Sequence, residues 1–133
     1  MDQGDKMLLI RDLSSRLPYG VKVEHIRTGM IGTLHEMRVY PLYDDNDVIY
    51  DYFCDTDFLG DDDKFDIIAF KPCLFPLSSM TDEQKKEWCS MVGEIEEHGH
   101  NVKLLDWLNK NHIDYRGLIQ LGLAIDATNK NIY

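Results

Sequence analysis

The chain has 133 residues, of which 44% are hydrophobic, and a formal net charge of −10. This length and composition predict a single folded domain spanning residues 1–133 and exclude a disordered acidic tail. No apolar run approaches the roughly 20 residues needed to cross a bilayer, and the N-terminal segment is too acidic and too poor in apolar residues for a secretory signal. We therefore expect a soluble, cytoplasmic protein.

One helix is expected before any strand. Over residues 5–16, apolar residues recur at three- and four-residue spacing, while Arg11, Asp12 and Arg16 fall on the opposite, polar side. A Pro-Tyr-Gly sequence at 18–20 then ends the helix, because proline fixes its backbone and glycine readily takes the left-handed conformation.

Short segments with alternating apolar residues predict four strands after this helix. The expected strands are 21–26, with Val21, Val23 and His25 on one face, 30–40, 47–53 and 65–71. Gly32 predicts a bulge or bend. Pro41 and Pro72 predict strand ends, because proline lacks the N–H that sheet pairing uses. Turns without a crossover helix join the strands, so we expect a small antiparallel sheet of four or five strands or an SH3-like partial barrel.

The last third of the chain predicts two or three helices. Thr81 and Gln84 form a capping box at the start of the first of them. A second helix is expected after an Asn101 cap, and a third, short helix after Asp114, with Gly122 as its left-handed terminator. The polar tail is expected to be loosely held. Strands followed by helices are typical of an α+β domain.

Most of the net charge lies in one window. Between Asp44 and Asp66 there are ten aspartates and one base, Lys64, so the window carries −9 and the rest of the chain −1. Such a window disfavours direct contact with nucleic acid or anionic lipid and suits a basic protein surface. Aromatic residues among the acids favour protein binding. The predicted partner-binding residues are Asp44, Asp45, Asp47, Tyr50, Tyr52, Asp61, Asp62 and Asp63.

The same aspartates leave a divalent-metal site open as an alternative. Positions 1, 3, 6, 7, 9 and 12 of a calcium-binding loop are matched by Asp55, Asp57, Gly60, Asp61, Asp63 and Asp66. Against this, Leu59 stands where an oxygen ligand is needed, and the flanking segments are predicted strands rather than helices. The alternative function is a metal-binding protein or a metal-dependent hydrolase that uses the Asp55–Asp66 loop.

Other motifs that could carry chemistry are less specific. Helix-end histidines such as His98, His100 and His112 are common for dipole and capping reasons, although a metal site could use them. The three cysteines have no zinc-ligand spacing and are expected to be free thiols in a reducing compartment. No nucleophile elbow, phosphate-binding loop or cofactor motif is recognisable, so we predict no cofactor and favour a non-enzymatic protein. The block from Trp107 to Ala124 is either an aromatic–arginine interaction patch or, as we favour, a layer docked on the sheet.

Three blocks carry a resemblance to a known group. They are RLPYGVKV at 16–23, FKPCLFPLSSMT at 70–81 and DWLNKNHIDYRGLIQLGLAIDAT at 106–128. In these blocks the chain resembles small uncharacterised proteins carried by bacteriophages and mobile elements of gut Bacteroidetes. The resemblance implies a bacterial host cytoplasm and a phage or prophage origin, and it brings no activity or catalytic residues.

The acidic window and this resemblance lead to one hypothesis about function. The chain would be an accessory protein that binds a protein partner through its acidic surface. One form of the hypothesis is inhibition of a host defence or nucleic-acid enzyme by imitation of the phosphate backbone. Self-association stays open as well.

Overall fold

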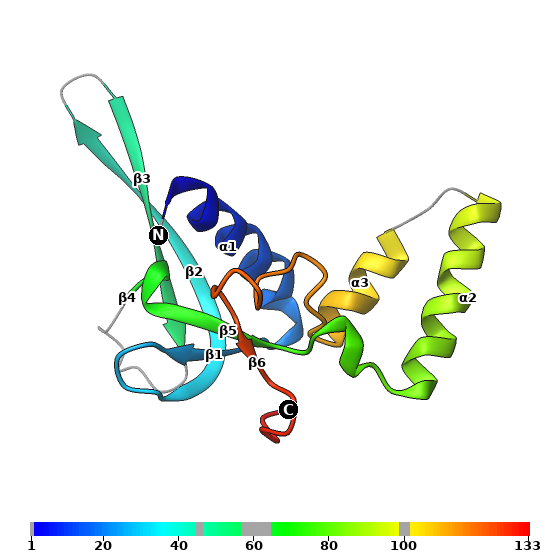
Figure 1. Cartoon of the computed structure of the whole chain (residues 1–133). Helices are drawn as coiled ribbons and strands as arrows, with labels where there is room; N and C mark the ends of the chain where they lie inside the picture. Colours follow the sequence, from blue (N-terminus) through cyan, green and yellow to red (C-terminus); the bar gives the residue numbers. More distant parts are fainter. Residues whose placement is uncertain (1, 45–46, 57–64, 99–101) are drawn as a thin grey trace.

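The fold is a mixed sheet with one helix packed on it and two helices beside it (Figure 1). The computed structural model describes residues 2–44, 47–56, 65–98 and 102–133, and their side chains except at 39–44, 47–55, 65 and 94–98. The helices are α1 (Gln3–Arg16), α2 (Asp82–His98) and α3 (Val102–Lys110), and the short 3-10 helices are η1 (Leu17–Tyr19), η2 (Ile67–Ala69) and η3 (Leu77–Ser79). The strands are β1 (Lys22–His25), β2 (Ile31–Asp44), β3 (Asp47–Thr56), β4 (Phe65–Asp66), β5 (Phe70–Leu74) and β6 (Ile125–Asp126).

The predicted α+β architecture is confirmed, with one difference in the sheet. The strand order is β4-β3-β2-β1-β5-β6, and all neighbours from β4 to β5 pair antiparallel, as their short connections predict. In contrast, β6 pairs parallel with β5. The parallel pair is possible because the chain between these strands passes through α2 and α3, which gives it the length that a crossover needs.

Two prolines lie inside strands that they were expected to end. β2 continues through Pro41, whose register partner is Tyr50. The β1 ladder reaches only Ile31–Thr33 of β2, so Pro41 lies where its missing N–H faces an edge. β5 likewise contains Pro72, which pairs with Val23, and β6 reaches only the two residues that follow. The predicted strand ends were therefore wrong at both prolines.

Two further details of the sheet differ from expectation. The predicted fourth strand is divided into β4 and β5 by η2, because the Asp66 carboxylate accepts a hydrogen bond from the Ile68 N–H at 3.2 Å and favours a turn there. Gly32 lies in regular register with β1 rather than at a bulge. The register shift is instead between Leu34 and Glu36, in the β2–β3 ladder.

The core lies between α1 and the sheet. Val21, Val23 and His25, which the sequence alternation placed on one face, are all buried. The buried apolar cluster draws on both ends of the chain, and its members are Leu9, Ile10, Leu13, Val21, Val23, Leu34, Ile67, Phe70, Leu74, Leu118, Leu123 and Ala124.

The helix-end predictions are confirmed where the structure describes them. At the start of α2, Gln84 N–H donates to Thr81 Oγ1 at 3.1 Å and Thr81 N–H donates to Gln84 Oε1 at 2.9 Å, which is the capping box. Gly20 follows η1 with a φ of 67°, so the Pro-Tyr-Gly stop is also present. The Asn101 cap lies outside the described residues.

The predicted third C-terminal helix is not formed, and the described chain has a hydrogen-bonded turn at 118–122 in its place. Leu123 N–H donates to Leu118 O at 2.9 Å and Gly122 N–H donates to Ile119 O at 3.1 Å, the pair of bonds that defines a Schellman end. Gly122 has the expected positive φ, 75°. The turn is short because Gly117, just before it, also takes a positive φ of 78° and breaks helical geometry there.

A buried ion cluster joins α1 to the C-terminal part of the chain. Asp12 is fully buried, and its carboxylate accepts hydrogen bonds from Arg16 Nε at 3.0 Å and from Arg116 Nη1 at 2.9 Å. Arg16, also fully buried, donates to Ile113 O at 2.6 Å. The two guanidinium carbons lie 5.3 and 4.5 Å from the centre of the Tyr115 ring. Asp12 and Arg16 were assigned to the polar side of α1, and that assignment was wrong because their charges are paired inside the fold.

Replacing Asp12 with alanine should lower the free energy of unfolding by about 3–5 kcal/mol, because the buried Arg16 guanidinium would lose its counter-charge. Urea unfolding of the full chain, followed by circular dichroism, measures this loss. Arg38→Ala is the control, because it removes a pair with Glu36 at 2.8 Å whose side chains are 38% and 46% exposed, and it should cost at most about 1 kcal/mol. Equal losses in the two variants would contradict a stabilising role for the buried cluster.

Candidate functional site

Several of the predicted partner-binding residues lie on a projecting two-stranded ribbon. Figure 1 shows β2 and β3 running together past the rest of the sheet. We call residues 39–44 of β2 and 47–52 of β3 the projecting ribbon. Its backbone register pairs Asp44 with Asp47 at the far end and Pro41 with Tyr50 further in. Asp45 and the three aspartates at 61–63 lie outside the described residues, so their predicted role stays a prediction.

The register assigns the ribbon's residues to two faces. Alternate residues of a strand share a face, and so do directly opposed residues of paired strands. Asp44, Asp47 and Asp51 therefore share one face, and Tyr50 and Tyr52 share the other. The register thus assigns Asp44, Asp47 and Asp51 to one face of the ribbon, with the Leu42–Ile49 pair between Asp51 and the other two.

The candidate metal residues fall partly outside the described chain. Asp66 is described, and its carboxylate is already engaged with the Ile68 N–H at the start of η2. The residues of the calcium-loop match that fall between 57 and 63 lie outside the described residues. Within the described parts of the chain, no group of three or more histidine, cysteine or acidic residues is placed to hold a metal ion.

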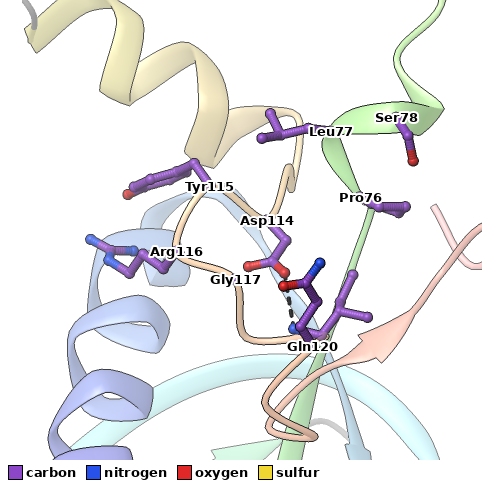
Figure 2. A pocket seen from close by; sticks show the side chains of 9 residues that line it. Pro76, Leu77, Ser78, Asp114, Tyr115, Arg116, Gly117 and Gln120 are labelled. Atoms are coloured by element: carbon purple, nitrogen blue, oxygen red, sulfur yellow. Dashed lines mark hydrogen bonds between the residues drawn. The ribbon is translucent and has the colours of Figure 1, made fainter.

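A pocket of about 480 Å³ lies between η3 and the turn that follows α3 (Figure 2). Its lining residues are Pro76, Leu77, Ser78, Asp114, Tyr115, Arg116, Gly117, Ile119 and Gln120. Both carboxylate oxygens of Asp114 accept backbone N–H groups at 2.9 Å, from Leu118 and Ile119. In Figure 2 the Arg116 side chain is directed towards α1, where it bonds Asp12 and Ser15. The charged side chains of this pocket, Asp114 and Arg116, therefore make hydrogen bonds that stabilise the fold.

The block from Trp107 to Ala124 also contributes mainly to packing. Trp107 is half-buried, meets the Trp88 ring edge-on at 6.4 Å, and donates from Nε1 to Glu87 Oε2 at 2.6 Å. Leu118 and Leu123 belong to the buried core. These contacts support the interpretation of the block as a docked layer.

The tail, expected to be loosely held, is anchored by Tyr133. The Tyr133 hydroxyl accepts from Lys22 N–H at 2.8 Å and donates to Cys73 O at 2.7 Å, so it bridges β1 and β5. Its ring stacks on His112, with centroids 4.0 Å apart and planes at 14°, and lies 5.7 Å from Phe75. The polar composition of the tail did not predict this contact. The one sequence feature that could have indicated it is the aromatic residue at the end of the tail.

Neither His112 nor Cys73 has a pKa that suits a catalytic role. Burial lowers the pKa of His112 to about 4, with Arg16 and Lys22 acting in the same direction, so the ring is neutral at pH 7. Burial raises the pKa of Cys73 to about 11, which keeps its thiol protonated. Both properties are typical of structural side chains. Cys89 is a free, exposed thiol.

Comparison of the chain with protein-family models, curated proteins and solved structures finds no match. The resemblance to phage and mobile-element proteins therefore stays a prediction. None of the helices in the described part of the chain is both long and apolar enough to cross a membrane. The projecting ribbon, with three aspartates assigned to one of its faces, is the feature of the chain from which a function can be inferred.

The stability of the chain should fall as the pH is lowered from about 6.5 to about 4. Folded His112 has a pKa of about 4 and the unfolded side chain one of about 6.5. Between these values the unfolded state binds more protons, so the free energy of unfolding rises with pH, and on the order of 2 kcal/mol present at neutral pH is lost by about pH 4.

Chemical denaturation over this pH range measures the effect. His112→Asn is the control, because asparagine has no titrating group and tolerates the φ of 57° at this position. Its stability should be less dependent on pH by the same amount. An identical pH slope in the two proteins would contradict the assignment to His112.

Proposed function

We propose that the chain is a non-enzymatic binding protein that contacts a basic protein surface through the acidic face of its projecting ribbon. The observation that carries the proposal is the backbone register, in which Asp44 and Asp47 oppose each other and share a face with Asp51. From residue 39 to residue 63 the sequence contains no lysine or arginine. Along the sequence, this stretch therefore carries no positive charge of its own, and Arg38, just before it, opposes Phe53 in the register.

The energetics of the ribbon favour such a partner. Like charges directly opposed across two strands destabilise the pair, and Asp44 opposes Asp47. A basic surface would relieve this repulsion on binding. Long-range attraction between complementary charges also raises the association rate. Both effects act without a catalytic group, in keeping with a binding role.

The resemblance in the three sequence blocks supports an origin in a phage or mobile element and a bacterial host cell as the setting. Under that origin, the fitting partners include host defence or nucleic-acid enzymes, because their phosphate-binding surfaces are basic. An acidic ribbon would occupy such a surface in place of the nucleic-acid backbone. The complex would then weaken strongly as ionic strength rises.

Neutralising the ribbon should weaken the complex at least about tenfold, since three opposite-charge contacts with a partner are worth roughly 0.5–1 kcal/mol each. The variant is Asp44→Asn with Asp47→Asn and Asp51→Asn. Partners captured from a bacterial lysate would be identified by mass spectrometry and purified, and their affinity measured by calorimetry at low and high salt.

The matched control removes three acids elsewhere. Asp82→Asn with Glu83→Gln and Asp106→Asn changes exposed residues of α2 and α3 by the same charge. This control should keep its affinity within about twofold, because these residues lie outside the proposed contact. Equal affinities for the ribbon variant and the control would contradict the proposal that the acidic face contacts the partner.

A further inference from the structure

The outward-facing backbone groups of the projecting ribbon can be identified from one residue. In an antiparallel ladder, alternate residues direct their N–H and C=O groups to the partner strand, and the residues between them direct these groups outward. Pro41 has no N–H, so its place in the β2–β3 ladder is an outward one. Its register partner, Tyr50, is then outward on β3. The same parity applies to the other residues, and the outward positions are Val39, Pro41 and Tyr43 on β2 and Val48, Tyr50 and Tyr52 on β3.

The two edges of the ribbon differ in their capacity to pair. On the β2 edge, Pro41 occupies the middle outward position and removes a donor, which is a common way of blocking strand addition. On the β3 edge, Val48, Tyr50 and Tyr52 each carry a backbone N–H. The β3 edge therefore presents an uninterrupted set of donors and acceptors for one further strand.

The short strand β4 already uses this edge. It pairs antiparallel with β3 at Cys54 and Phe53, and then the chain turns away into η2 after Asp66. Among the described residues, β4 is the only element that pairs with this side of β3. A strand that continued along the line of β4 would reach the outward groups of Tyr52, Tyr50 and Val48 in turn.

The charges along β3 specify what such a strand should contain. Asp47, Asp51 and Asp55 are four residues apart and share a face of β3. Basic residues at alternate positions of an added strand would lie on that face, where each opposite-charge pair across strands contributes roughly 0.2–1 kcal/mol. A second copy of this chain fits poorly, because pairing β3 with β3 would bring aspartates of the two copies together.

We propose that the partner adds an extended basic segment to the outer edge of β3, antiparallel to it and continuing the line of β4. The proposal rests on the binding role inferred above and states how the ribbon binds. Backbone hydrogen bonds supply affinity, and alternate lysine or arginine residues supply selectivity. A third strand also gives the projecting ribbon the support that an isolated two-stranded hairpin lacks in water.

Peptides with a blocked backbone test the proposal on the full chain. The probe is a fluorescent peptide of about eight residues that alternates four lysines with four valines, long enough to span the free edge. With lysines on the aspartate face, the valine N–H groups point at β3 and the lysine N–H groups point away. N-methylation of the valines should weaken binding, measured by fluorescence anisotropy at low salt, at least tenfold. N-methylation of the lysines, with the same charge and the same number of methyl groups, should change it less than about threefold.

Variants of the chain test the same edge from the other side. Tyr50→Pro removes one outward N–H and leaves the ladder with β2 in place, whereas Tyr50→Val keeps the N–H and also removes the phenol. The unmethylated peptide should bind Tyr50→Pro at least about tenfold more weakly than Tyr50→Val. Thermal melting checks that both variants fold, and if the proline variant does not, the two methylated peptides still decide the question.

The outcomes separate this proposal from the binding role. If the two methylated peptides bind equally well, strand addition is overturned while recognition by charge remains. If no peptide binds at low salt, both the strand addition and the acidic contact are overturned. If the chain alone forms a dimer that excludes the peptide, the edge belongs to a second copy, and the proposed occupant is wrong.

Discussion

The fold depends on the carboxylate of Asp12, which is held between two guanidinium groups in the interior. Arg16 lies one turn further along α1, but Arg116 lies 104 residues away in sequence. Through this contact, and through the bond from Arg16 to Ile113 O, the C-terminal segment is fixed against the first helix. Pairing offsets the cost of burying each charge, and breaking the contact would leave a buried charge unpaired. Arrangements that separate α1 from the segment around Arg116 are therefore disfavoured.

The sequence predicted the features that nearby residues determine. The capping box of Thr81 and Gln84, the alternation of faces along β1 and the left-handed Gly122 all follow from residue types within a few positions of one another. The strand ends at Pro41 and Pro72 could not be predicted in this way. Whether a proline is tolerated depends on which side of it another strand lies, and that is a property of the assembled sheet.

Burial of charge was the other feature that local pattern could not supply. Asp12 and Arg16 look like residues of a solvated helix face, because only the folded chain brings Arg116 to the same carboxylate. The anchored tail is a similar case. Tyr133 stabilises the fold through hydrogen bonds with Lys22 and Cys73, which are far from it in sequence. For the proposed site, the sequence located the charge, but only the strand register showed which residues share a face.

The two edges of the projecting ribbon show how a fold can favour one pairing over others. Exposed strand edges invite association, and proteins usually interrupt them with proline or charge. Here Pro41 interrupts the β2 edge, while the residues of β3 keep their backbone donors and carry aspartates on one face. Those aspartates oppose pairing with another copy of the same strand and favour a basic one. In the proposed binding mode, the aspartates of β3 therefore have two effects. They oppose aggregation of the free chain along β3, and they select a basic segment as the strand that pairs with its outer edge.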